Sequence, residues 1–409
     1  MANFHMNLMK RHPKKIVLAY SGGLDTSVIL KWLKETFGAE VVACYVNIGQ
    51  REDYAAIRKK AFSTGASGFF APEVKEEFVT GYLWPALKAR AIYEGKYLLG
   101  TSLARPLIAE KVVEVARKVK ADAVAHGATG KGNDQVRFEL TFAALAPHLQ
   151  VIAPWRIWDF KGREDLVQFA HAHGIPVPVT KKRPYSSDEN LWHISHEGGI
   201  LEELEKEVPE DVFTWTVSPQ KAPAAGLDFT LGFQKGVPVS LNGRRMSPVQ
   251  MVLKLNEWGG KHAIGRVDMV ENRLVGLKSR GVYECPAATI LYFAHHELES
   301  LVLDRETVHY KEMVGARLGE MIYYGLWFAP LRKALQAFVE ETQKYVTGEV
   351  KLRLLKGNLV VLSRHSQKSL YSQDWVTFEK DALYNQADAT GFINLFGLPL
   401  KMESLLRKQ

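Results

Sequence analysis

The chain has 409 residues, 46% of them hydrophobic and 24% charged, an ordinary composition for a globular protein of two domains. Lys and Arg outnumber Asp and Glu by 53 to 45, which suits anionic substrates, but no block of like charges indicates a nucleic-acid-binding surface. No apolar run approaches the roughly 20 residues of a bilayer crossing, and two cysteines, Cys44 and Cys285, are too few for a disulfide framework or a four-ligand zinc site. We therefore expect a cytoplasmic protein without membrane or nucleic-acid partners.

The first 180 residues alternate between β-rich runs and segments whose apolar residues have helical spacing. Residues 1–13 are polar and basic, and we expect a mobile extension there. The runs that predict strands are Lys15–Tyr20, Glu40–Val46, Ala121–His126, Val151–Ala153 and Val177–Val179. The segments that predict helices are Thr26–Phe37, Glu52–Thr64, the stretch from Ile108 to Val119, and Glu164–His173. This rhythm predicts a doubly wound α/β domain over residues 14–180, with a mostly parallel sheet and helices on both faces.

The pattern changes near Lys181–Pro184, and residues 181–375 are expected to form an α+β domain. Turn signals predict two hairpins, one at Asn242-Gly243 and one at Lys356-Gly357-Asn358. Helices are predicted around Pro248–Trp258, Ala287–Leu303 and Arg332–Val346. The remaining residues, 376–409, form a tail in which Asp388–Gln409 is loosely amphipathic and is interrupted at Gly397 and Pro399. Such a tail suits a packed terminus and a partner-binding arm equally well.

The most informative string is SGGLDTS at Ser21–Ser27, between a predicted buried strand and a predicted helix. The two glycines allow a tight turn and close approach of the backbone to a ligand. The hydroxyls, together with N–H groups at the start of the helix, form an anion cradle. Asp25 is an unusual neighbour for bare phosphate, but it is suited to a Mg²⁺ ion that accompanies phosphates. The string lacks the Gly-Lys-Ser/Thr ending of a Walker A loop.

Two further loops carry polar groups where a predicted helix begins, and the second of them also follows a predicted strand. One reads LLGTSLARPLI over Leu98–Ile108, and the other reads HGATGKGNDQVRFE over His126–Glu139. A core has no use for Asn133, Asp134 and Arg137 so close together, so we interpret the second loop as part of a binding site.

Taken together, these strings resemble the argininosuccinate synthase family, a branch of the ATP pyrophosphatase superfamily. The strings VIAPWR, HGIPVPVT, ENLWHIS, HAIGRVDMVENR, KSRGVYE and LYFAH match the family in the same order, and weaker likeness (SLYSQD, DATGFI) reaches the C-terminus. The resemblance implies a ligase that joins L-citrulline to L-aspartate while ATP is cleaved to AMP and pyrophosphate, through a citrullyl-adenylate. Adenylation supplies a leaving group that the ureido carbon lacks, and the protein positions the reactants and excludes water.

The resemblance also implies a set of contact residues. For ATP they are Ala19, Tyr20, Ser21, Gly22, Gly23, Leu24, Asp25, Thr26, Ser27, Val46 and Gly127. For citrulline they are Tyr97, Ser102, Asn133, Arg137, Ser186, Ser195, Glu271 and Tyr283, and for aspartate Thr129, Asn133 and Asp134. Asp25, Asp134 and Arg137 are the expected catalytic residues: Asp25 beside Mg²⁺, Asp134 as acceptor of the amine proton, and Arg137 for a carboxylate or developing oxyanion. No dedicated metal site is expected beyond Asp25.

The sequence departs from the family pattern at Ser187, His196, Cys285 and Ala288, none of which is an expected contact residue. Two other functions remain open from the residues alone. An RNA-thiolating enzyme on the same nucleotide fold usually carries reactive cysteines and a basic surface, and a non-catalytic nucleotide-binding protein would have little use for the polar loops. By resemblance, the chain is expected to form a homotetramer through its C-terminal arm.

Overall fold

The computed structural model describes residues 12–176, 185–376 and 385–407. Most of the predicted extension 1–13, the strand Val177–Val179 and the domain boundary near Lys181–Pro184 lie outside these residues. The chain divides into two compact units, residues 1–368 and residues 369–409. None of the helices in the described part of the chain has the length and apolar composition that a membrane crossing requires.

A five-stranded parallel sheet forms the N-terminal part of unit 1. Its strands are β1 (Lys15–Ala19), β2 (Glu40–Cys44), β3 (Gly68–Phe70), β4 (Ala123–Ala125) and β5 (Gln150–Ile152), in the order β3-β2-β1-β4-β5. Every neighbouring pair is parallel. The predicted doubly wound fold and its four strands within the described residues are confirmed; the short strand β3 was not predicted.

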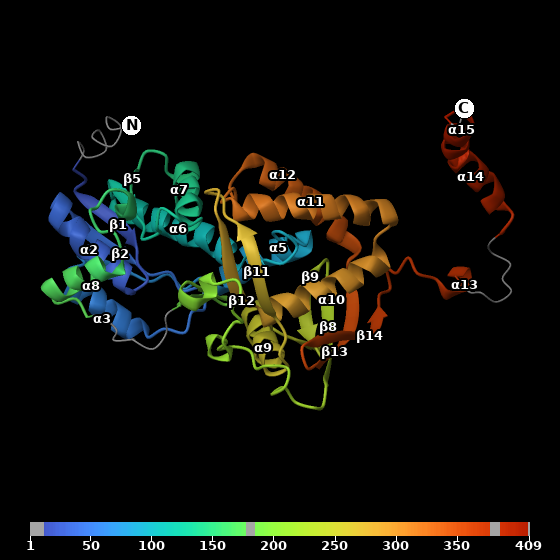
Figure 1. The fold of residues 1–409 in the computed structure, drawn as a ribbon, viewed down its shortest axis with the longest axis horizontal. Coiled ribbons are helices and arrows are strands. Elements are labelled where there is room, and N and C mark those ends of the chain that lie inside the picture. Colours follow the sequence, from blue (N-terminus) through green and yellow to red (C-terminus); the bar gives the residue numbers. More distant parts are fainter. Residues whose placement is uncertain (1–11, 177–184, 377–384, 408–409) are drawn as a thin grey trace. The chain divides into compact units, whose positions relative to one another are not determined.

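Helices cover both faces of this sheet because residues of β1 alternate between two cores. Ile16 and Leu18 pack in one cluster, and Val17 and Ala19 pack in the other. The first face carries α2 (Leu24–Phe37), α3 (Tyr54–Thr64) and α8 (Arg163–Ala172), and the second carries α6 (Gly100–Val119) and α7 (Asp134–Leu145) (Figure 1).

The strand order determines where the polar loops meet. The chain builds β2 on one side of β1 and later places β4 on the other side, so the carboxyl ends of β1 and β4 lie next to each other. In open parallel sheets this switch point is where ligands bind. The loop after β1 is SGGLDTS, and the loop after β4 is the glycine-rich loop that precedes α7.

A four-stranded antiparallel sheet faces these loops. It consists of β6 (Ser186–Glu189), β7 (Ile194–Glu197), β11 (Arg266–Asn272) and β12 (Lys278–Glu284), in the order β11-β12-β7-β6. Ser195 pairs with Tyr283 across β7 and β12, so these two side chains project from the same face of the sheet.

A five-stranded antiparallel sheet and several helices complete unit 1. The strands are β8 (Leu227–Gln234), β9 (Val237–Leu241), β10 (Arg244–Arg245), β13 (Gly348–Leu355) and β14 (Asn358–His365). The helices are α4 (Lys75–Glu77), a π-helix η1 (Phe78–Leu83), α5 (Trp84–Ala89), α9 (Pro248–Lys261), α10 (Pro286–Val302), α11 (Arg305–Tyr323) and α12 (Pro330–Thr342), with short 3-10 turns at Pro154–Arg156, Gly199–Glu202, Glu210–Val212 and Gln343–Tyr345. The two predicted hairpins and the three predicted helices are confirmed, and Asn242 and Gly243 both have the positive φ of a two-residue hairpin turn.

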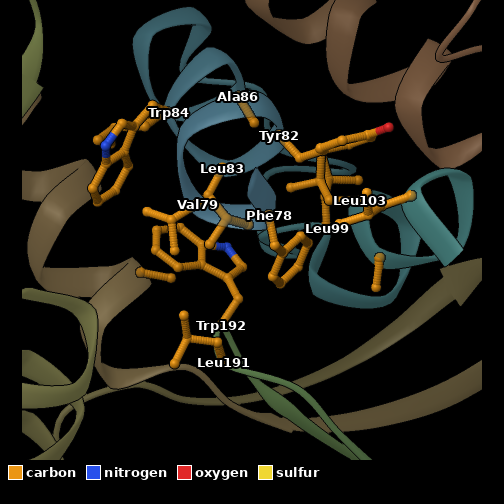
Figure 2. Packing of buried hydrophobic residues seen from close by; sticks show 14 of the residues in the cluster. Phe78, Val79, Tyr82, Leu83, Trp84, Ala86, Leu99, Leu103, Leu191 and Trp192 are labelled. Atoms are coloured by element: carbon orange, nitrogen blue, oxygen red, sulfur yellow. The ribbon is translucent and has the colours of Figure 1, made fainter. Parts of the chain in front are cut away.

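The turn between β6 and β7 is anchored in the hydrophobic core by Trp192. Its side chain is fully buried beside Phe78 and Leu83 (Figure 2), and its indole N–H donates to the carbonyl of Leu98 at 3.0 Å. Burying an aromatic residue of this size fixes both strands of the hairpin against η1 and α6.

Unit 2 contains α13 (Gln373–Val376), α14 (Asp388–Phe396) and α15 (Leu398–Leu406). The predicted interruption at Gly397 is confirmed, because α14 ends immediately before it. Phe392 and Phe396 stack with their ring centroids 5.2 Å apart, yet neither helix buries any of its residues.

Two of the departures from the family pattern, Ser187 and His196, pair across β6 and β7, and both are among the residues that line the cavity described below. The Ser187 hydroxyl lies 2.8 Å from His196 Nδ1, and His196 Nε2 lies 3.0 Å from Glu284. Glu284 is fully buried and also accepts the backbone N–H groups of residues 214, 215 and 216. Burial alone would raise the pKa of Glu284, but the hydrogen bonds from His196 and these residues outweigh it and hold the pKa below its ordinary value of 4.5.

We expect Glu284→Gln to lower the free energy of unfolding by about 3 kcal/mol, because an amide cannot accept all of these donors. A carboxylate with a depressed pKa contributes stability above its unfolded-state pKa and loses it as pH falls through the folded-state value. The difference between wild type and variant in urea denaturation should therefore be complete at pH 7 and shrink below about pH 4.5.

The matched control is Glu210→Gln, because Glu210 pairs with Arg266 at the surface, where an ion pair contributes at most about 1 kcal/mol. Equal effects of the two substitutions would contradict a structural role for the buried carboxylate.

Candidate active site

A cavity of about 810 Å³ lies between the loops after β1 and β4 and the polar face of the antiparallel sheet. Most of the expected contact residues line it: Ala19, Tyr20, Ser21, Gly23, Leu24, Asp25, Thr26, Val46, Tyr97, Gly127, Thr129, Asn133, Asp134, Arg137, Ser186, Ser195, Glu271 and Tyr283. Gly22, Ser27 and Ser102 do not line it. The Ser27 hydroxyl is buried and donates to the carbonyl of Gly23 at 2.7 Å, so it stabilises the loop without lining the cavity.

Hydrogen bonds of its own hydroxyl groups stabilise the loop after β1. Ser21 Oγ and Thr26 Oγ1 lie 3.1 Å apart, and the N–H of Gly23 donates to Ser21 Oγ at 3.3 Å. Gly22 has a φ of +78°, and a Cβ there would lie 2.9 Å from a side-chain carbon of Ile57. Lys60 Nζ donates to the carbonyl of Gly22 at 2.8 Å. The turn therefore requires glycine at position 22 and leaves the start of α2 facing the cavity.

Asp25 is in the first turn of α2 and faces the same cavity. Burial raises the pKa of Asp25, and the charge of Arg163 only partly opposes this. No ion pair involving Asp25 is present among the described residues, and no group of three or more His, Cys, Asp or Glu side chains there could hold a metal. A partly buried carboxylate of this kind fits a cation that arrives with the phosphates.

Asp134 lies between two guanidinium groups. Its Oδ2 accepts from Arg105 Nε at 2.8 Å, and its Oδ1 accepts from Arg137 Nη1 at 2.8 Å. Arg105 also donates to Asp188 on β6. Burial alone would raise the pKa of Asp134, but the two arginines outweigh it and lower the pKa below its ordinary value. Asp134 is therefore ionised at neutral pH.

Two atoms of ionisable side chains in the cavity are buried without a hydrogen-bond partner. Within the described part of the chain, Arg137 Nη2 and Glu271 Oε2 have none, although both residues are less than 10% exposed. Tyr283 donates to the other oxygen of Glu271 at 3.2 Å. Burial raises the pKa of Glu271, an effect that the charge of Arg137 and the hydroxyls of Tyr323 and Tyr283 only partly oppose. Native proteins rarely leave buried charged atoms unpaired, so a ligand is the natural partner. One cation and one anion match the α-carboxylate and α-ammonium of an amino acid.

The family models match nearly the whole chain in two parts. Residues 15–176 match the Arginosuccinate synthase N-terminal HUP domain, and residues 185–403 match the Arginosuccinate synthase C-terminal domain. The chain belongs to the argininosuccinate synthase family. The suspected resemblance is thereby confirmed.

Curated members of the argininosuccinate synthase family are similar to this chain over almost their whole length. The argininosuccinate synthase of Endomicrobium trichonymphae is 58% identical over 395 residues, which cover 97% of this chain and 96% of the relative. That of Carboxydothermus hydrogenoformans is 60% identical over 97% of this chain and 98% of the relative. That of Pelotomaculum thermopropionicum is 57% identical over the same shares.

The two cysteines are unsuited to the rival chemistry of RNA thiolation. Both are buried, and burial raises the pKa of Cys44 and of Cys285 to about 12 in each case. Thiols of this kind remain protonated at neutral pH and are poor nucleophiles.

Unlike Ser187 and His196, the other two departures from the argininosuccinate synthase pattern lie outside the cavity lining. Cys285 precedes α10, and its thiol lies 3.3 Å from the carbonyl of Gly265. Ala288 is fully buried within α10. The cavity is lined at this point by Tyr283, two residues before Cys285.

Sequence reasoning missed several residues of the cavity, chiefly Arg105, Asp188, Arg163 and Tyr323. Arg105 did carry a signal, because it is a lone cation within the apolar string SLARPLI of α6. Tyr323 carried none, since it ends a helix far along the chain and reaches the cavity only through the tertiary fold.

Proposed function

We propose that this cavity carries out the family's reaction in two steps, with the residues arranged as described above. The chain is an ATP-dependent ligase that forms argininosuccinate. One observation supports this proposal: the SGGLDTS loop, Arg137 Nη2 and Glu271 Oε2 all lie in one cavity. The first binds phosphates, and the other two bind the ends of an amino acid.

In the first step, ATP lies along the carboxyl ends of β1 and β2, against Ala19, Tyr20, Val46 and Gly127. The loop from Ser21 to Thr26 holds the outer phosphates through N–H and hydroxyl groups, while Gly22 and Ser27 shape the loop from outside the cavity. Citrulline lies across the cavity with its α-ammonium at Glu271 and its α-carboxylate at Arg137. Its ureido oxygen attacks the α-phosphorus, pyrophosphate leaves, and citrullyl-adenylate results.

Ser186, Ser195, Tyr97 and Tyr283 supply hydrogen bonds to the uncharged part of citrulline. Ser102 is fully buried within α6, and its hydroxyl has no hydrogen-bond partner among the described residues, so its contact with citrulline stays a prediction. Mg²⁺, when bound with ATP, would be held by Asp25 and would neutralise charge on the phosphates.

In the second step, the amine of aspartate attacks the activated ureido carbon and AMP departs. Thr129 and the backbone of the glycine loop face the carboxylates of aspartate, and Asn133 and Asp134 face its amine. Asp134 is ionised, as a proton acceptor must be, but its two arginine partners make it a weak base. We therefore propose that it accepts the amine proton only as the adenylate breaks down.

The domain division at residue 180 and the cytoplasmic location stay predictions. The continuous core of unit 1 contains residues from both sides of that boundary, such as Val17, Leu107, Ile290 and Val350.

The activity is tested by pyrophosphate release from ATP and Mg²⁺ with the purified chain. We expect release to require both citrulline and aspartate and to yield AMP. Glu271→Gln should raise the citrulline KM roughly 10- to 100-fold, because a charged hydrogen bond contributes about 1.5–3 kcal/mol, and leave the ATP KM unchanged.

The matched control is Glu197→Gln, another carboxylate of the cavity that pairs with Arg273 and is mostly exposed. It should change the citrulline KM less than about threefold. Formation of ADP, or turnover without citrulline, would exclude the proposed reaction.

We predict that Asp134→Asn lowers kcat at least about 100-fold, because it removes the proton acceptor and leaves two guanidinium groups without their shared anion. Pyrophosphate release with aspartate, measured from pH 6 to 9, gives kcat and its pH profile. Asp268→Asn is the control, since Asp268 pairs with Arg280 on the back of the same sheet. An Asp134→Asn variant that retains full turnover with aspartate would rule out the proton-acceptor role.

We propose that residues 388–409 form the arm that holds a homotetramer together. α14 and α15 bury none of their apolar side chains within their own unit, so a second copy of the chain is the expected cover. Deleting residues 388–409, or substituting Phe396→Asp, should reduce the mass measured by light scattering, whereas Lys401→Glu on the same arm should not. An unchanged mass after the deletion would remove the arm from the interface.

A further inference from the structure

Tyr323, the last residue of α11, lines the cavity and is 1% exposed. Its ring stacks on Tyr93 with the centroids 3.6 Å apart and the planes 9° from parallel, and Tyr97 contacts it edge-on. A ring packed on two sides has one available rotamer, so its hydroxyl has a fixed position.

That hydroxyl determines the orientation of Asn133. Asn133 Nδ2 donates to the Tyr323 hydroxyl at 2.8 Å, and Asn133 Oδ1 accepts the N–H of Leu274 at 2.8 Å. The Leu274 contact requires an oxygen, so the amide cannot be flipped. Asn133 also sits at the N-cap of α7, where asparagine normally bonds to the helix, but its side chain makes no cap bond. The side chain bonds instead to Tyr323 and to the backbone of Leu274.

Tyr323 also determines the direction of Arg137. Arg137 Nε donates to the carbonyl oxygen of Tyr323 at 3.0 Å, and the guanidinium lies over the Tyr323 ring, 4.9 Å from its centroid. With Nη1 on Asp134, these contacts leave Nη2 as the atom that faces a ligand. One residue therefore orients two neighbouring groups that come from a different helix.

We infer that Tyr323 is a positioning residue for the amino-acid substrates, acting through Asn133 and Arg137 rather than on the reacting atoms. This inference rests on the proposed function, in which both residues bind substrate. Groups held in one orientation before the substrate arrives lose less entropy on binding, so their positioning raises kcat/KM. Sequence motifs cannot reveal this role, because Tyr323 is 190 residues from Asn133.

The test is Tyr323→Phe, which removes only the hydroxyl and keeps the ring stacking and the backbone contact to Arg137. We expect kcat/KM for citrulline and for aspartate to fall about five- to tenfold, the factor that one neutral hydrogen bond contributes, while the KM for ATP changes less than twofold. Tyr292→Phe is the matched control: Tyr292 is also buried, its hydroxyl donates to the carbonyl of Ala91, and it lies outside the cavity lining. It should leave all three parameters unchanged.

A double-mutant cycle with Asn133→Ala separates positioning from a general structural effect. If Tyr323 acts through Asn133, adding Tyr323→Phe to Asn133→Ala should lower kcat/KM for aspartate by no more than about twofold. Aspartate is the readout because the Tyr323 hydroxyl also interacts with Glu271, which we place at citrulline. Additive losses, or equal changes in all three KM values, would overturn the inference. A wild-type chain that releases pyrophosphate without citrulline would instead overturn the proposed function, and the two failures are thus distinguishable.

Discussion

The carboxylate of Asp134, held between Arg105 and Arg137, joins the parts of the molecule that the active site requires. Asp134 opens α7, Arg137 lies one turn later, Arg105 projects from α6, and Arg105 continues to Asp188 on β6. This chain of charges therefore connects the nucleotide-binding sheet to the antiparallel sheet. A buried ion pair is weak evidence of stability but strong evidence of defined geometry when every partner has a bond. Among the described residues, this geometry leaves Arg137 Nη2 buried in the cavity without a protein partner.

The nucleotide half could be predicted from sequence because its signals are local. Strand β1 is a run of buried residues, and the glycines after it end the strand and begin α2 at a fixed place. The parallel order then requires the loops after β1 and β4 to meet, whatever their side chains are. Most of the expected contact residues consequently line one cavity, although Gly22, Ser27 and Ser102 do not.

The second half was harder to predict because its strands violate the usual alternation of apolar and polar residues. Strands β7 and β12 are polar on the cavity face, where Ser195 and Tyr283 lie, and also at the adjacent positions, where His196 meets Glu284. Helix α11 was not predicted for a different reason. Its glycines at 315 and 319 weaken helix propensity, yet a Cβ at either position would lie within 2.6 Å of a backbone carbonyl oxygen of residues 89 or 92. Only the packed structure explains them.

The hydrophobic core of unit 1 crosses the boundary between the two family domains. Its largest cluster runs without a break from the parallel sheet, through α6, to α10 and β13. A fragment ending at residue 176 would lack the part of this cluster that α10 and β13 contribute, including Ile290 and Val350. The N-terminal family domain and the part of the C-terminal family domain up to residue 368 thus share one hydrophobic core, so separating them would expose apolar surface of both.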